Sequence, residues 1–476
     1  MRRQRYGFVL GCVLIVGSLA ATAVAVRHHV TIGVQRDGSI VVPNGQLLTP
    51  AGTHIEVNDR PLGMVLAPNR RTLAVVTGSN FNSRGLHLID IDTSTVTQTI
   101  NIANSFVGVA FNPAGNRIFV GGGSSNDVKL FAAGPSGAFA ADGTIPVSGG
   151  AAPSGLSLSP DGTRLYVALN MTHEVAVIDT AARRILARVP VGIYPYTTVT
   201  SLDGSKVYVS NWGGKVPGPT DFTDGNFPVV VDRRTGIPVT GTVSVLDTAS
   251  NTVIKHIDVG LHPTGMALSP AGDRLYVTNA NSDTVSAINT VNDTVVKTLH
   301  VGGRDGGPNA LLGSSPNAVT VSPDGLTLYV ANAAQNAVAV VDASSSADDP
   351  VRGLIPTGWY PTAVGLDATG DRLFIASGYG FGSIAPTPPG QGRSYQDRVG
   401  VVSILDLPDR QDLARFTKQV RDNNDVLPPV DDLHDKTGPG AAHEPIPMHL
   451  GDRSPIKHVF YVIKEDRKST RLNSSH

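Results

Sequence analysis

A short pattern that occurs seven times along the chain limits its fold more than any other feature. Each copy has a run of small apolar residues, a tight turn, an aromatic-aliphatic run, and an alternating apolar segment that ends near Asp. The turns begin at Pro68, Pro113, Pro160, Leu202, Pro270, Pro323 and Ala368. A period of about 45 residues built from short strands is typical of a β-propeller with one four-stranded blade per repeat. The sequence therefore predicts an all-β, seven-bladed propeller.

Each repeat contains strands of different composition, which we name a to d from the axis outward. Strand a, as in 155–158, is small and apolar because seven such strands converge on one axis. Strand b, as in 275–277, is β-branched and aromatic, which suits burial between blades. The Pro and Gly between them fit a type I turn followed by a residue with positive φ.

The last repeat predicts how the ring closes. No outer strand follows Asp406, and residues 412–423 favour a helix instead. Thr53–Val57 has the pattern of an outer strand and directly precedes the first strand a. We therefore expect this N-terminal strand to complete the last blade, which removes exposed sheet edges.

The segment Tyr276-Val277-Thr278-Asn279 spells the motif of a known repeat family. Over residues 50–408 the chain resembles YVTN-repeat β-propellers. That family includes binding modules, surface proteins, lactonase-like enzymes and sensors, so the resemblance implies a fold and leaves the activity open.

Charge and cysteine content exclude several classes of function. The chain has 38 basic and 39 acidic residues, so no basic surface is indicated and we expect no nucleic-acid partner. Its single cysteine, Cys12, excludes an intrachain disulfide and a cysteine-based metal site.

Residues 1–26 have the pattern of a targeting segment. A basic start at Arg2, Arg3 and Arg5 precedes an apolar run and small residues that fit a signal-peptidase site. A cleaved signal peptide and an uncleaved membrane anchor both remain open. In either case we expect export to the periplasm or the cell exterior, with a membrane partner only for the anchor. Residues 27–49 form a lead-in to the propeller.

One face of the predicted propeller carries the long connections. In such a ring the b-to-c and d-to-a connections share a face, and the insertions at 211–242, 302–314 and 378–398 all belong to these connections. Loops on a rigid scaffold often carry function. The polar and aromatic residues on them, which we take as candidate ligand-binding residues, are Tyr194, Tyr196, Asn211, Trp212, His262, Trp359 and Tyr360.

Two interpretations of these residues remain open. They recognise a small molecule or surface ligand, or they pack against the insertions. No His-Glu-x-x-His, phosphate-binding glycine loop or Gly-x-Ser-x-Gly occurs, so we assign no catalytic residue and no cofactor to the propeller.

The C-terminal part changes in composition. Residues 409–455 predict a helix and a polar linker, and residues 456–465 predict a new strand. The segment 458–465 resembles the first strand of an alkaline-phosphatase-like phosphoesterase domain. That resemblance implies that Glu465 helps to bind a divalent metal, although Asp466 departs from the family's Asn. Propellers of this type recur in fusion with such domains, so a partner phosphoesterase domain is implied.

The final residues 466–476 read DRKSTRLNSSH, one frame of a common sequencing adapter, and we expect them to be foreign to the protein. The catalytic half of the phosphoesterase would then be missing from this chain. The sequence thus favours the exported recognition module of a metal-dependent phosphoesterase. A stand-alone binding or surface protein and a lactonase-like hydrolase within the propeller are the alternatives.

Overall fold

The computed structural model describes residues 32–78, 84–223, 225, 227–302, 313–347, 349–382 and 399–424. The targeting segment 1–26, most of the linker and the phosphoesterase-like strand with Glu465 lie outside these residues, so the expectations for them stay predictions.

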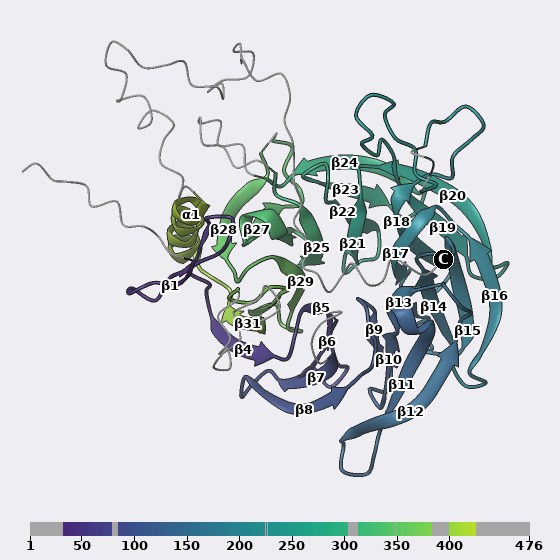
Figure 1. The fold of residues 1–476 in the computed structure, drawn as a ribbon, viewed down its shortest axis with the longest axis horizontal. Helices are drawn as coiled ribbons and strands as arrows, with labels where there is room; N and C mark the ends of the chain where they lie inside the picture. Colours follow the sequence, from purple (N-terminus) through teal and green to yellow (C-terminus); the bar gives the residue numbers. More distant parts are fainter. Residues whose placement is uncertain are drawn as a thin grey trace, which may run out of the picture. The chain divides into compact units, whose positions relative to one another are not determined.

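Within the described residues, seven four-stranded antiparallel sheets surround a central axis, which confirms the predicted propeller (Figure 1). Blade 1 contains β5 (Pro61–Leu66), β6 (Thr72–Thr77), β7 (Gly85–Asp90) and β8 (Thr95–Asn101). Blade 2 contains β9 (Val109–Phe111), β10 (Arg117–Gly121), β11 (Asp127–Ala133) and β12 (Phe139–Pro146). Blade 3 contains β13 (Pro153–Leu158), β14 (Arg164–Leu169), β15 (Glu174–Asp179) and β16 (Arg184–Pro190).

The remaining blades follow in chain order. Blade 4 contains β17 (Ile193–Thr200), β18 (Lys206–Gly214), β19 (Gly241–Asp247) and β20 (Thr252–Val259). Blade 5 contains β21 (Pro263–Leu268), β22 (Arg274–Asn279), β23 (Thr284–Asn289) and β24 (Thr294–His300). Blade 6 contains β25 (Pro316–Val321), β26 (Thr327–Asn332), β27 (Ala337–Asp342) and β28 (Val351–Pro356). Blade 7 contains β29 (Pro361–Leu366), β30 (Arg372–Ser377), β31 (Gly400–Asp406) and β4 (Thr53–Val57).

Blade 7 closes the ring as predicted. β4 pairs with β31 in the register Gly400↔Val57 to Ile404↔Thr53. The Arg372 side chain crosses from blade 7 to blade 1, where Nη2 lies 3.0 Å from Asp92 Oδ1 and Nη1 donates to the Ile91 carbonyl at 2.8 Å. The N-terminal strand and this arginine together join the two ends of the propeller.

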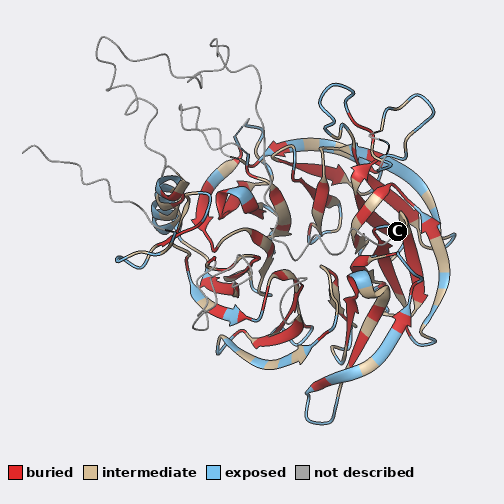
Figure 2. Cartoon of the chain, viewed as in Figure 1, coloured by how far each residue is buried: buried red, intermediate tan, exposed pale blue. Residues whose placement is uncertain are grey.

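The core lies between neighbouring blades rather than in one central mass (Figure 2). Strands b and c are the most buried strands, and Tyr166 and Tyr208 of strand b are among the largest side chains that are fully buried. Outer strands such as β8 alternate between half-buried and exposed residues because one of their faces meets solvent. Burial from both sides explains why strand b is aromatic and β-branched.

The turns between strands a and b have the predicted geometry. The glycine of this turn has φ between 71° and 81° in six blades, as at Gly162 and Gly370, and Arg70 takes its place in blade 1 with φ 59°. A Cβ at Gly162 would lie 2.6 Å from Pro113 Cδ of the preceding blade's turn. Successive turns therefore stack on one another around this face, which we call the turn face.

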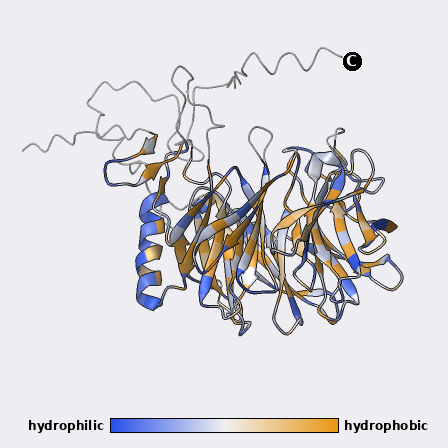
Figure 3. Cartoon of the chain, turned by 90° about the horizontal axis from the view of Figure 1, so that it is seen from below, coloured by the Kyte–Doolittle hydropathy of each residue, from blue (hydrophilic) through white to orange (hydrophobic). Residues whose placement is uncertain are grey.

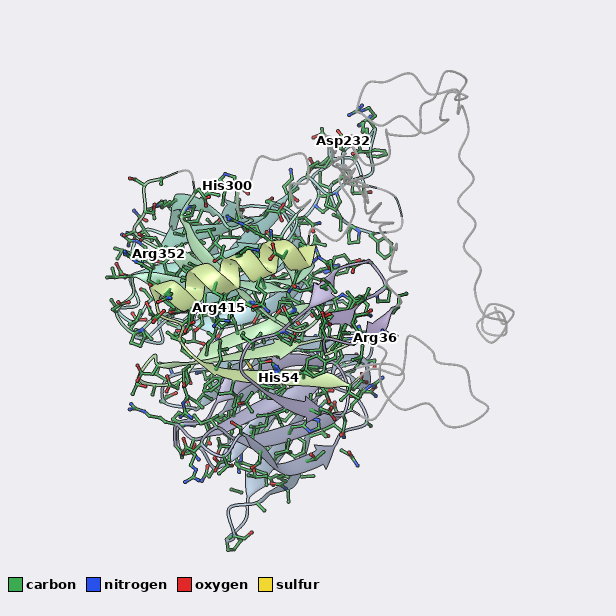
Figure 4. The ribbon with its side chains drawn as sticks, turned by 90° about the vertical axis from the view of Figure 1, so that its left-hand side faces the viewer. Arg36, His54, Asp232, His300, Arg352 and Arg415 are labelled. Carbon is green, nitrogen blue, oxygen red and sulfur yellow. The ribbon has the colours of Figure 1, made fainter. Side chains whose placement is uncertain are left out.

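Two further elements lie outside the blades. Helix α1 (Arg410–Asn424) packs along β28, where Leu413 and Phe416 join an interblade core cluster. A small sheet lies on the side of the ring opposite the turn face (Figure 3). It contains β1 (Gly33–Val34), β2 (Ile40–Val41) and β3 (Leu47–Leu48). Figure 4 shows α1 with Arg415 along the rim of the ring, and β4 with His54 lower in the same view. Among the described residues, no helix is long and apolar enough to cross a bilayer.

Candidate functional site

The face opposite the turn face carries the b-to-c and d-to-a connections, and we call it the insertion face. Strand β18 continues to Gly214, beyond the length of other b strands, and leads into the insertion of blade 4. Two isolated bridges, Thr223↔Val230 and Val231↔Pro238, order this insertion. Arg36 of the β1–β3 sheet and Asp232 of the insertion lie toward the same side of the ring in Figure 4. Most of the insertions at 302–314 and 378–398 lies outside the described residues.

A cavity of about 190 Å³ lies in the central channel, between the strands a of all the blades. Its lining residues are mostly small, because seven inner strands leave little room for side chains, and more of its exposed wall is polar than apolar. Met64 and Met266 are its largest aliphatic groups, and Asn317 and Thr362 add polar atoms. Tyr196 is the aromatic residue of the lining, and it connects the cavity to the insertion face.

A three-ring stack stands at this mouth of the channel. The rings of Tyr196 and Trp212 lie 4.1 Å apart with an interplanar angle of 22°, and those of Trp212 and His262 lie 4.8 Å apart at 19°. The edge of Phe106, from blade 2, meets Tyr196 at 6.0 Å. The stack therefore joins residues of blades 2, 4 and 5, and brings together three of the residues that the sequence predicted. The Trp212 ring stacks against both neighbours, so Tyr196 and His262 form the two ends of the stack.

A second aromatic group lies at blade 7. Tyr379 contacts both Trp359, at 4.9 Å between ring centroids, and Tyr360, at 5.3 Å. Trp359 also packs on the apolar side of the β1–β3 sheet, against Ile40, Val42 and Leu48. Trp359 thus packs against the lead-in segment, and Tyr360 contacts the third member of the group, Tyr379.

The backbone at these positions is unusual. Tyr194, His262 and Tyr360 have φ of 53°, 54° and 61°, and each directly precedes a proline. Left-handed backbone costs an ordinary residue roughly 1–2 kcal/mol. Ala152 and Ser315 repeat this geometry in blades 3 and 6, so it belongs to the d-to-a connection itself. The connection therefore gives the same backbone geometry to one residue from each of several blades on the insertion face.

Local hydrogen bonds hold these connections. Tyr194 N donates to His173 Nδ1 at 3.1 Å, and the two rings meet edge to face at 4.9 Å. Tyr360 N donates to Asn336 Oδ1 at 2.9 Å. Tyr194 therefore lies beside blade 3, apart from the stack of Tyr196 and Trp212.

Asn211 has a different place from the other candidates. It is fully buried, and its Nδ2 donates to Ser244 Oγ at 2.9 Å and Thr242 Oγ1 at 3.1 Å. Asn279 and Asn332 end strand b in the next two blades and are equally buried, and among the described residues Oδ1 of all three asparagines accepts no hydrogen bond. The repeated asparagine therefore forms a polar layer inside the blades, below the surface of the insertion face.

Burial determines the protonation of the stack. It raises the pKa of Tyr196 above the ordinary value, with a smaller contribution from the nearby Tyr360 phenol, so this hydroxyl stays protonated. Burial lowers the pKa of His262 and of His173, which keeps both imidazoles neutral at pH 7. The mouth thus offers a neutral phenol and neutral imidazole groups beside aromatic rings, a composition found in ligand pockets.

The sequence prediction missed Phe106, Tyr379 and Arg60 at this site. Arg60 directly precedes Pro61 in a d-to-a connection, as Tyr194 and His262 precede their prolines, so position in the repeat would have identified it. Phe106 belongs to a connection without that proline, and Tyr379 follows strand b of blade 7. In the described part of the chain, no three His, Cys, Asp or Glu side chains converge as a metal site.

Comparison with known proteins supports the fold only. No family model matches the sequence, and no curated protein matches it. A solved structure of Kuenenia stuttgartiensis hydrazine synthase is similar over 75% of this chain and 97% of the other, with a TM-score of 0.55. The two sequences are 19% identical over that match, so the similarity concerns the architecture and carries no activity to this chain.

Proposed function

We propose that this protein is a recognition module that binds a small ligand at the insertion-face mouth of its central channel. The observation that carries this proposal is the convergence of aromatic residues from several blades above the cavity, with Tyr196 in both the stack and the cavity wall. Aromatic groups with a few polar atoms around a concave site are the usual composition of ligand pockets. The rigid ring supports this site without needing to change shape on binding.

Tryptophan fluorescence tests the proposal, because the chain has two tryptophans, Trp212 and Trp359. In a Trp359→Phe variant the emission reports on Trp212 in the stack. We expect a saturable change in emission with one class from a panel of oligosaccharides, lactones, amides and organic acids. The change should disappear in the same variant carrying Tyr196→Ala.

A matched substitution on the turn face provides the control. Arg70 is exposed there, and Arg70→Gln should leave the response unchanged. A response that survives Tyr196→Ala and is lost in Arg70→Gln would place the ligand site on the turn face and contradict the proposal.

We further propose that the module is exported and serves a metal-dependent phosphoesterase, on the resemblance of residues 458–465 and the pattern of residues 1–26. The position of α1 is consistent with this proposal. Asn424 at its C-terminal end donates to the Gln335 carbonyl in the b-to-c connection of blade 6, so the last described residue lies at the insertion face. The gene sequence after the codon for Glu465 tests the proposal: metal-ligand clusters over several hundred codons are expected, and a stop codon would contradict it.

A further inference from the structure

The cavity in the central channel has a polar wall without charge. Among the described residues that line it, none has an acidic or basic side chain, although more of the exposed wall is polar than apolar. Tyr196, Thr197, Asn317 and Thr362 are the lining residues with polar side chains. The other lining residues are glycine, alanine and larger apolar residues, so their peptide groups are the remaining source of polar surface.

The inner strands approach one another closely enough for peptide groups to form this wall. Strand a is the inner edge of every blade, and an edge strand presents unpaired N–H and C=O groups. A Cβ at Gly63 would lie 2.0 Å from the Val107 carbonyl oxygen, and one at Gly108 would lie 2.1 Å from that of Ser154. Glycine at this position of the repeat therefore leaves the backbone of neighbouring blades in contact, with no side chain between them.

A shift in strand register recurs at the same level of the channel. Leu62, Asn317 and Thr362 each directly follow a proline and lie outside the register between strands a and b of blades 1, 6 and 7. Tyr196 and Thr197 lie outside it in blade 4. All five residues belong to the cavity lining. Because a bulge of this kind disrupts the ladder, it makes further peptide groups available at one level of the channel.

The wall is poorly suited to ions. Thr362 Oγ1 donates to the Pro61 carbonyl of the next blade at 2.7 Å, and Ser154 Oγ donates to the Tyr196 carbonyl at 2.8 Å. Blades 5 and 6 are joined by an equivalent bond of 3.2 Å. These inner carbonyls already accept hydrogen bonds, and the described lining offers no carboxylate for a hard cation and no positive group for an anion. An ion would therefore lose hydration without gaining a counter-charge.

A neutral molecule with several hydroxyl groups matches such a wall. A hydroxyl both donates and accepts hydrogen bonds, as do the N–H and C=O groups of an edge strand taken together. The cavity has a volume of about 190 Å³, and a cavity of about 150 Å³ is known to hold benzene, so roughly six to ten non-hydrogen atoms fit. Met64, Met266 and the Tyr196 ring supply apolar contacts for the carbon atoms of such a molecule.

We propose that the channel binds a small uncharged polyol or monosaccharide through the peptide groups of the inner strands and the Asn317 amide. This amide has no hydrogen-bond partner among the described residues, and Tyr196 lies between the site and the aromatic stack. The proposal rests on the proposed recognition function and names the ligand class for that site. It implies selection against ions and against apolar molecules of the same size.

Calorimetric titration of the whole chain with a series of four-carbon solutes tests this proposal. Erythritol carries four hydroxyls, 1-butanol carries one, and erythronate is the anionic counterpart of erythritol; xylose is the larger cyclic probe. We expect wild type to bind erythritol and xylose, and to bind erythritol at least about fivefold more tightly than 1-butanol or erythronate, a difference equivalent to one or more neutral hydrogen bonds. This comparison uses wild type alone, so it does not depend on how a variant folds.

An Asn317→Leu variant then locates the site. It replaces the amide by an apolar group of similar size, so erythritol binding should weaken by about fivefold while 1-butanol binding becomes no weaker. Thr320→Val is the matched control, because Thr320 lies on the same strand β25 but outside the cavity lining. It should leave both affinities unchanged.

Each contrary result has a defined meaning. Binding of 1-butanol or erythronate as tight as that of erythritol would overturn the assignment to a neutral polyol, and equal erythritol affinity in wild type and Asn317→Leu would place the site elsewhere. No binding of erythritol or xylose would mean that the channel holds water only. If Trp212 then still responds to a lactone, an amide or an organic acid, the recognition function stands and only this inference is removed.

Discussion

Tyr208 of blade 4 donates a hydrogen bond of 2.8 Å to Asp293 Oδ1 of blade 5, inside the contact between the two blades. Lys206 Nζ donates to the other carboxylate oxygen of Asp293 at 2.7 Å. Asp293 is 5% exposed, so the phenol and the ammonium together satisfy a carboxylate that solvent hardly reaches.

Tyr208→Phe should therefore destabilise the propeller. The substitution keeps the ring and leaves one oxygen of a buried carboxylate without its donor, which costs about 1–3 kcal/mol. Tyr276 is the matched control, since it occupies the same place in blade 5 and its hydroxyl forms no hydrogen bond within the described residues. Urea denaturation of both variants checks this. An equal loss of unfolding free energy in Tyr276→Phe would contradict a specific role for Asp293.

His87 should make stability depend on pH. It is 1% exposed on β7, and burial lowers its pKa to about 4. The unfolded chain takes up this proton near pH 6.5, whereas the folded protein resists it until about pH 4. The contribution is therefore fully present above pH 6.5 and is lost as the pH falls toward 4, by on the order of 3 kcal/mol.

Denaturation of wild type and His87→Gln at several pH values between 7.5 and 4 measures this contribution. Burial also lowers the pKa of His54, His173 and His262, so wild type and variant should both lose stability in acid. The variant should lose less, because it lacks the most shifted of these histidines. Parallel curves would show that His87 does not titrate in this window.

Ring closure should depend on β4. A chain that starts at residue 59 lacks this strand, and with it the buried side chains of Ile55 and Val57. Burial of each such side chain contributes about 1.5–3 kcal/mol, so we expect a large fall in melting temperature and an exposed edge on β31. A chain that starts at residue 49 keeps β4, loses only the β1–β3 sheet and should melt closer to the full chain. Identical melting of the two truncations, measured by circular dichroism, would refute closure by β4.

The turn face offers a test of backbone strain. Gly162→Ala should lower stability by about 1–2 kcal/mol, because alanine is strained at positive φ. Its Cβ would also lie 2.6 Å from Pro113 Cδ. Arg70→Gly, at the equivalent turn of blade 1, should be neutral or stabilising by up to about 1 kcal/mol, since glycine relieves the strain there. Opposite signs for these two changes in thermal unfolding are the expected result.

The ring was predictable from the repeat pattern, because each feature of that pattern depends on residues that are close together in the sequence. The strand composition, the Pro and Gly of the turns and the missing outer strand after Asp406 each concern a few neighbouring residues. The pairing of Thr53–Val57 with β31 was also predictable, although it joins distant parts of the chain, because a closed ring needs a partner for the last open edge.

The candidate site was predictable only as a face. Position in the repeat placed Tyr196, Trp212, His262, Trp359 and Tyr360 on the insertion face, and that placement agrees with the structure. Which of them meet was not predictable. Side chains from blades 2, 4 and 5 come together through the radius of the ring and the direction of each connection, and the local pattern contains neither quantity.

Residues with similar sequence patterns consequently have different surroundings. Trp212 lies near the end of β18 and Trp359 follows β28, both on the insertion face, yet Trp212 stacks between Tyr196 and His262 while Trp359 packs against the β1–β3 sheet. Arg60 belongs to no motif in the sequence, and its contact with the Tyr379 ring is seen only in the tertiary structure. Strand periodicity and turn chemistry act between neighbours, so the sequence alone determined the blades and their closure. Stacking, burial and charge pairing act across the ring, and only the tertiary structure decided which side chains share the mouth of the channel.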